Sequence, residues 1–143
     1  MKKISLCVFI LSIICFLPSS LFAQDDDKVI AYYFHTTFRC SSCHNIEQYT
    51  EEAIKNNFAK EVETGELVYK VINIEEKGNE HFVQDYKLYT KSVVLSLIQG
   101  GKEVRFKNLE QVWQLLRNKD KFYQYIKNET QGFLDSLREG DQL

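Results

Sequence analysis

The sequence predicts one α/β domain in which a mixed four-stranded sheet is flanked by helices. Two observations carry this prediction. Strand-like apolar segments and segments of helical periodicity follow one another in the order βαβ and then αββα. The first crossover requires parallel neighbours, whereas the tight turn expected at Gly100-Gly101 requires antiparallel ones. A sheet of mixed strand directions with helices on both faces satisfies both requirements.

The first half of the domain is predicted to form a strand, a helix and a second strand. Residues 29–35 are apolar enough for a strand that is covered on both faces. Apolar residues then recur at helical spacing from Cys43 to about Val62, and Gly65 is placed to end this helix. Residues 67–72 form the second predicted strand.

The second half begins with a short helix and a hairpin. Asn79 is placed to cap a short helix that ends at Tyr86. The two glycines then join strands predicted at residues 92–98 and 104–106.

The C-terminal extension shows helical periodicity in two parts. Asn108 is expected to open it, with Gln111 as a capping-box partner, and a break is expected near residues 118–120. The apolar positions that define its buried face are Leu109, Val112, Trp113, Leu116, Phe122, Tyr123, Ile126, Phe133, Leu134 and Leu137.

The N-terminal residues have the pattern of an export signal. Two lysines precede an apolar run that is shorter than the roughly 20 residues of a membrane span, and Ala23 suits cleavage. We therefore expect a signal peptide at residues 1–23, a disordered leader at 24–28 and the folded domain at 29–143. The mature chain is expected to be periplasmic or secreted, and to meet a membrane only through the uncleaved signal.

Charge and cysteine content restrict the chemistry of the mature chain. The formal net charge is −2 for the whole chain and about −4 without the two signal lysines, and no basic cluster is present, so we expect no nucleic-acid partner. Cleavage would remove Cys7 and Cys15 and leave Cys40 and Cys43. A bridge that closes so short a loop contributes little loop entropy, so this pair suits disulfide exchange better than a structural role.

The sequence Cys40-Ser41-Ser42-Cys43 follows the first predicted strand and opens the first predicted helix. The N–H groups and dipole of a helix start stabilise a thiolate, and the thiolate is the form that attacks disulfides. We therefore predict that Cys40 is the nucleophile and that Cys43 is the more buried, resolving thiol. Arg39 is expected to lower the pKa of Cys40 as a neighbouring positive charge. This chemistry needs no organic cofactor, and its partner would be a protein thiol or disulfide.

This order of elements, with the cysteine pair at the start of the first helix, resembles the thioredoxin fold from residue 29 to about residue 116. The sequence is also similar to the thioredoxin-like ArsF-type family described as "nitrophenyl compound nitroreductase subunit". The segments that carry this similarity are Ala31-Tyr32-Tyr33-Phe34-His35, Phe38-Arg39-Cys40, Cys43, Ile46-Glu47, Gly101-Lys102-Glu103-Val104 and Lys107-Asn108-Leu109. The resemblance implies a secreted or periplasmic thioredoxin-like protein that acts with redox partners. The chain shows no flavin or nicotinamide site, so we do not extend the nitroreductase reaction to it.

Two positions depart from the pattern of thioredoxins. A cis-proline usually lies opposite the cysteine pair; Val93 occupies its place here, so the Ser92-Val93 bond is expected to be trans. The resemblance also implies a buried acid in the first strand that carries protons for the second cysteine, and Phe34 replaces it. His35, with an ordinary pKa of about 6.5, is the alternative proton relay that we predict.

Three other functions remain open at the level of the sequence. A soft Cu(I) or zinc site would use Cys40, Cys43 and either His44 or His35. Cys40, Cys43 and His44 also form a CxxCH pattern for c-type haem, but the single methionine opens the chain, so His81 would have to serve as axial ligand. A non-catalytic redox-partner subunit would dock through the aromatic residues around Trp113. Neither the direction of exchange nor the oligomeric state follows from the sequence.

Overall fold

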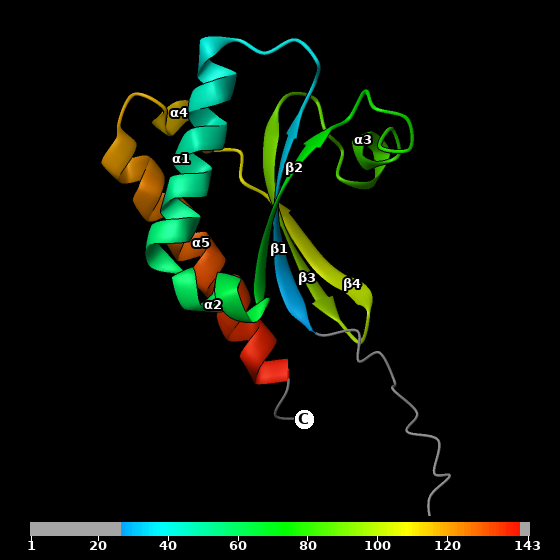
Figure 1. The fold of residues 1–143 in the computed structure, drawn as a ribbon, viewed down its shortest axis with the longest axis vertical. Coiled ribbons are helices and arrows are strands. Elements are labelled where there is room, and N and C mark those ends of the chain that lie inside the picture. Colours follow the sequence, from blue (N-terminus) through cyan, green and yellow to red (C-terminus); the bar gives the residue numbers. More distant parts are fainter. Residues whose placement is uncertain (1–26, 141–143) are drawn as a thin grey trace, which may run out of the picture.

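The computed structural model describes residues 27–140 (Figure 1). The predicted signal peptide at 1–23 and most of the leader at 24–28 lie outside the described residues, as do residues 141–143. Lys28, which we expected in the leader, is the first residue of the first strand. Within residues 27–140, no helix is both long and apolar enough to cross a membrane.

Four strands form one mixed sheet. They are β1 (Lys28–His35), β2 (Leu67–Asn73), β3 (Ser92–Gln99) and β4 (Lys102–Asn108). Their order across the sheet is β2-β1-β3-β4. Strand β1 is parallel to β2 and antiparallel to β3, and β3 is antiparallel to β4. This strand order with these directions is that of a thioredoxin-like fold, so the predicted fold class is confirmed.

The turn between β3 and β4 is the hairpin that the two glycines predict. Gly100 has a φ of 57° and Gly101 a φ of 74°. Two consecutive residues in the left-handed region form the turn whose twist matches that of antiparallel strands, and glycine adopts this region without steric cost. The hairpin is longer than predicted, because β4 extends on both sides of residues 104–106.

The predicted helix from Cys43 to Val62 is two helices. α1 (Ser41–Asn57) begins two residues earlier than expected, and α2 (Ala59–Thr64) follows a break at Phe58. Phe58 has a φ of −133° and a side chain that is 2 % exposed, so the backbone leaves the helical conformation where its ring enters the core. Val62 is consequently directed away from the core and is exposed. Gly65 ends α2 with a φ of 81°, as predicted.

The short helix α3 (Phe82–Asp85) is a single turn without the predicted cap. His81 precedes it and makes no capping hydrogen bond through its side chain. The Asn79 side-chain amide instead donates to the backbone carbonyl of Asn73, 3.0 Å away, and so fastens the loop that follows β2. The prediction that Asn79 caps this helix was wrong, because its side chain donates instead to a backbone carbonyl of β2.

The predicted capping box after the hairpin is also absent. Asn108 is the last residue of β4, and α4 (Val112–Leu115) begins after Gln111, whose side chain makes no capping hydrogen bond. The predicted break does occur, and α5 (Lys119–Gly140) follows it. Asn118 accepts a hydrogen bond at its Oδ1 from the Lys121 backbone N–H at 3.0 Å, which is the contact of a helix cap.

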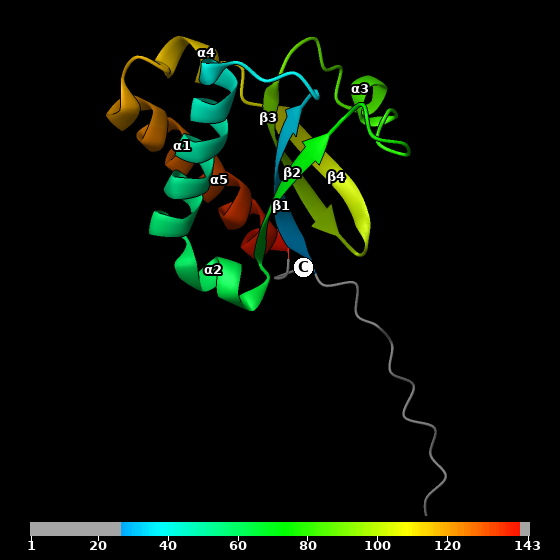
Figure 2. The same ribbon diagram turned by 45° about the horizontal axis from the view of Figure 1, so that its top comes forward.

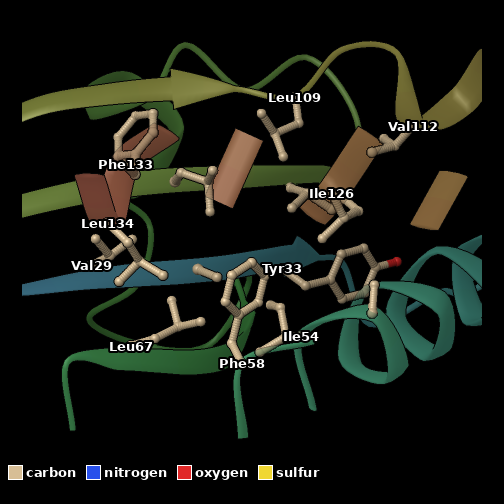
Figure 3. Close-up of a cluster of buried hydrophobic side chains, with 14 of the residues drawn as sticks. Val29, Tyr33, Ile54, Phe58, Leu67, Leu109, Val112, Ile126, Phe133 and Leu134 are labelled. Carbon is tan, nitrogen blue, oxygen red and sulfur yellow. The ribbon is translucent and has the colours of Figure 1, made fainter. Parts of the chain in front are cut away.

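The helices cover the two faces of the sheet unequally. α1, α2, α4 and α5 lie on one side, and α3 lies on the other (Figures 1 and 2). Side chains alternate along β1, so that Ala31 and Tyr33 face the larger apolar cluster beneath α1 and α5, part of which Figure 3 shows. Tyr32 and Phe34 face a smaller aromatic cluster beneath α3. Burial on both faces explains why the first strand is apolar at nearly every position.

Candidate functional site

The cysteine pair lies where β1 leads into α1. Cys40 is the N-cap residue of α1, with an extended backbone at φ −87° and ψ 169°, and Cys43 lies in the first helical turn. Cys40 is exposed and Cys43 is 1 % exposed. Both are free thiols, and their sulfurs lie 2.7 Å apart. The pair therefore presents one thiol to a partner and keeps the second within reach behind it.

The surroundings of the two thiols shift their pKa values in opposite directions. The hydrogen bond between the two sulfurs lowers the pKa of Cys40, because the Cys43 thiol can donate to a Cys40 thiolate. The backbone N–H groups of Cys43 and Ser42, in the first turn of α1, act in the same direction. Burial raises the pKa of Cys43, and donation to Cys40 raises it further. At neutral pH the exposed thiol is thus the better source of a thiolate.

Arg39, which we expected to act on Cys40, is paired with a carboxylate of α1. Its guanidinium forms an ion pair with Glu47 of α1 and lies over the Tyr33 ring, 5.6 Å from the ring centroid. Glu47 neutralises the charge that we expected to favour the Cys40 thiolate. The role of lowering the pKa of Cys40 belongs instead to the helix start and to Cys43.

Tyr33 is a site residue that the sequence analysis missed. It is fully buried, and its hydroxyl donates a 2.7 Å hydrogen bond to the backbone carbonyl of Cys43. Burial raises the pKa of Tyr33 to about 12, so the hydroxyl stays protonated and remains a donor. No signal in the sequence distinguishes this tyrosine from Tyr32, because both belong to one apolar run and only the alternation along β1 separates them.

His35 lies at the end of β1, where it contacts its own loop. Its Nδ1 lies 2.8 Å from the backbone carbonyl of Thr36, and its ring stacks near Tyr33 with 5.9 Å between centroids. These contacts fit a histidine that orders the loop leading to the cysteine pair. Its role as a proton relay remains a prediction.

Val93, at the position of the cis-proline, and Phe34, at the position of the buried acid, are both fully buried. None of the peptide bonds within residues 27–140 is cis, so the Ser92-Val93 bond is trans, as expected. Val93 is paired with Tyr33 in the sheet, and its carbonyl accepts a hydrogen bond from the Leu109 backbone N–H at 2.8 Å. Phe34 packs within the aromatic cluster beneath α3.

The alternative metal site does not assemble. No group of three or more histidine, cysteine, aspartate or glutamate side chains with metal-binding geometry occurs in the part of the chain that the structure describes. His44 is exposed on α1, next to the buried Cys43. His81, the haem ligand that the CxxCH pattern would need, pairs with Asp85 beside α3 through a 2.7 Å contact at its Nδ1.

Comparison with known proteins gives matches among solved structures. No protein-family model and no curated protein sequence matches the chain. The chain is similar to thioredoxin of Fasciola hepatica, at 21 % identity over 76 % of this chain and 86 % of that one, with a TM-score of 0.43. It is similar to the germline-specific thioredoxin Deadhead of Drosophila melanogaster, at 17 % identity over 69 % and 85 % of the two chains, with a TM-score of 0.43. Thioredoxin O2 of Arabidopsis thaliana matches at 18 % identity over 71 % and 80 %, with a TM-score of 0.41.

Proposed function

We propose that this protein is an exported thiol–disulfide oxidoreductase that exchanges electrons with protein partners through Cys40 and Cys43. The observation that carries the proposal is the asymmetry of the pair. Cys40 is exposed with a lowered pKa, whereas Cys43 is buried with a raised pKa, and their sulfurs are in contact. A structural disulfide or two inert thiols would not require this arrangement.

The geometry supports a two-step exchange. The Cys40 thiolate attacks one sulfur of a partner disulfide, a mixed disulfide forms, and the other partner sulfur leaves with the electron pair and takes up a proton from water. Cys43 then loses its proton and attacks the Cys40 sulfur, which releases the second partner sulfur as a thiolate. The partner disulfide is reduced, and the cysteine pair is oxidised to a bridge. The reverse sequence oxidises a partner dithiol, and both directions use the same contacts.

Export and subfamily are further parts of the proposal. The lysines and apolar run at the start of the chain support a signal peptide at residues 1–23 and a periplasmic or secreted protein. The segments around Phe38-Arg39-Cys40 and Lys107-Asn108-Leu109 support a place in the ArsF-type thioredoxin-like family. We propose exchange with a redox partner as the activity, and not nitroreduction.

A redox titration of the purified mature protein tests the activity. The protein is equilibrated in glutathione buffers, free thiols are trapped by alkylation, and the mass of the whole chain is measured. We expect Cys40 and Cys43 to change together between no and two added alkyl groups, at a potential within about −120 to −270 mV, the range of known exchange proteins. A pair that remains oxidised or reduced across this range would contradict the proposal. The variant Cys40→Ser should form no mixed disulfide with a partner through position 40.

A further inference from the structure

The last strand of the sheet, β4, has one edge that no strand within residues 27–140 covers. The order β2-β1-β3-β4 places β3 between this edge and the strand that leads to the cysteine pair. The backbone N–H of Leu109, the residue after β4, donates to the Val93 carbonyl, so the odd-numbered residues at this end of the hairpin bond to β3. Bonding directions alternate along an antiparallel strand, so the backbone N–H and C=O groups of Phe106 and Asn108 point outward. Such an edge can accept a further strand.

A hollow of about 340 Å³ lies between β4 and α5. Arg105 and Lys107 of β4 line one wall, and Glu129, Gly132 and Phe133 of α5 line the other. A Cβ placed on Gly132 would meet no atom outside its own stretch of helix within 4 Å. The hollow is therefore open at the glycine, and it has room for a side chain that a neighbouring segment supplies.

The hollow carries one cation that no carboxylate neutralises. The Lys107 ammonium group pairs with Glu129 at 2.7 Å. Arg105, by contrast, forms no ion pair within residues 27–140. Its Nη2 donates to the Ser136 hydroxyl at 3.2 Å, and its guanidinium carbon lies 4.2 Å from the centre of the Phe133 ring. The ring orients the guanidinium, and a carboxylate is a stronger acceptor for it than a serine hydroxyl.

The same strand presents an apolar side chain on the other face of the sheet. Phe106 packs edge-on against Tyr86, with 5.0 Å between the ring centroids, and it remains 40 % exposed. Successive side chains of an extended segment point to opposite faces of a sheet. A segment paired with β4 would therefore direct alternate side chains into the hollow, toward Arg105, and over the ring of Phe106.

We propose that the β4 edge and this hollow bind an extended segment of a partner protein in which acidic and apolar side chains alternate. The main chain of the segment pairs with the backbone groups of Phe106 and Asn108, as in other cases of strand addition. A carboxylate of the segment enters the hollow and takes the place of the Ser136 hydroxyl on Arg105. The apolar side chains cover Phe106.

The occupant is a different protein and not a second copy of this chain. Two β4 edges joined about a twofold axis at Phe106 would place Arg105 of one copy opposite Lys107 of the other, and like charges directly opposite destabilise a strand pair. The docking edge goes beyond the exchange function proposed above, and it does not depend on it.

A labelled synthetic peptide of about ten residues, in which glutamate and valine alternate, tests the proposal. It is titrated into the mature protein and followed by fluorescence anisotropy, and amide chemical shifts of the isotope-labelled protein locate the contact. We expect saturable binding that shifts the amides of Phe106, Asn108 and Gly132. A peptide with lysine in place of glutamate, or with the same residues arranged in two blocks, should bind at least about tenfold more weakly, because it loses the ion pair or the alternation.

Two variants separate the hollow from its charge. Gly132→Leu fills the hollow and should weaken binding at least about tenfold, while leucine, as a better helix former than glycine, keeps α5 folded. Gly132→Ala is its matched control and should retain binding. Arg105→Gln should weaken binding by about threefold to tenfold. Lys70→Gln removes the same charge from β2, at the opposite margin of the sheet, and should leave the affinity unchanged.

Three results would overturn the proposal. They are the absence of saturable binding, equal binding of the lysine peptide, and an unchanged affinity in Gly132→Leu. The Cys40→Ser variant should bind the alternating peptide as tightly as the unaltered protein, because β3 separates the docking edge from the strand that leads to Cys40. Failure of the docking edge would therefore leave the redox titration unaffected, and failure of the titration would leave the docking edge standing.

Discussion

Replacing Tyr33 with phenylalanine removes a single hydroxyl from beneath the cysteine pair. The ring is fully buried, so its packing beneath Arg39 is retained, while the 2.7 Å hydrogen bond to the Cys43 carbonyl and the polar interaction of the hydroxyl with Arg39 are lost. A buried hydrogen bond contributes about 0.5–1.5 kcal/mol to stability. The Cys43 carbonyl keeps its partner within the helix, so we expect Tyr33→Phe to lower the free energy of unfolding by about 1 kcal/mol.

Urea unfolding of the reduced protein, followed by circular dichroism, measures this loss. The midpoint should fall while the slope of free energy against urea stays the same, because the surface exposed on unfolding is unchanged. Tyr69→Phe is a matched control. Its hydroxyl also donates to a backbone carbonyl of α1, that of Glu47, but at 3.3 Å. This longer bond should contribute less, about 0.5 kcal/mol.

The losses of unfolding free energy in Tyr33→Phe and Tyr69→Phe are then compared. A loss for Tyr33→Phe that is no larger than the loss for Tyr69→Phe would refute the expectation that the shorter hydrogen bond, from Tyr33 to the first turn of α1, contributes more to stability. A changed slope would show instead that the substitution alters the compactness of the native or unfolded state.

Three further predictions concern residues beside the site. Arg39→Gln should leave the pKa of Cys40 unchanged in alkylation profiles, because Glu47 already pairs with the guanidinium, and should lower stability by about 1–3 kcal/mol, because the mostly buried Glu47 carboxylate loses its partner. Phe34→Asp should cost more than the roughly 3–5 kcal/mol of a Phe→Ala deletion, because it also buries a carboxylate, and thermal unfolding would show a stable variant if this is wrong. Stability should fall as pH rises from 10 to about 12, since unfolded Tyr33 loses its proton near 10 and folded Tyr33 near 12, and urea midpoints in Tyr33→Phe should fall less steeply.

The strands were predictable because each carries its own local signal. The continuous apolar run of β1, the glycine that ends α2 and the paired glycines of the hairpin act within a few residues, and the structure confirms all three. The predicted caps failed for the opposite reason. The partner of Asn79 is a carbonyl in a different element, and Asn108 remained in a strand that paired with β3. A capping pattern competes with every other partner that the fold brings near, and the sequence does not show those partners.

The same distinction between local signals and partners from distant elements applies to the candidate site. The placement of Cys40 and Cys43 was predictable because it depends on a spacing of three and on the start of a helix. The charges around them were not, because an adjacent residue in the chain need not be an electrostatic neighbour. Arg39 directly precedes Cys40, yet its charge is directed to Glu47. Lys91 is distant from Cys43 in the sequence, yet its positive charge lowers the pKa of Cys43.

The alternation along β1 explains why the missing acid cannot be restored at its own position. Phe34 points away from α1, and its ring lies 5.1 Å from that of Phe82 and 5.4 Å from that of Tyr86. A carboxylate there would enter this aromatic cluster, while the residue that faces Cys43 from the same strand is the neutral Tyr33. Neither Phe34 nor Tyr33 therefore offers a charge that favours the Cys43 thiolate; burial raises the pKa of Cys43, and a backbone hydrogen bond at Cys40 and the charge of Lys91 lower it. The loop before β3 is the neighbour of β1 where β1 ends, and Lys91 is the cation on that loop whose charge acts on Cys43.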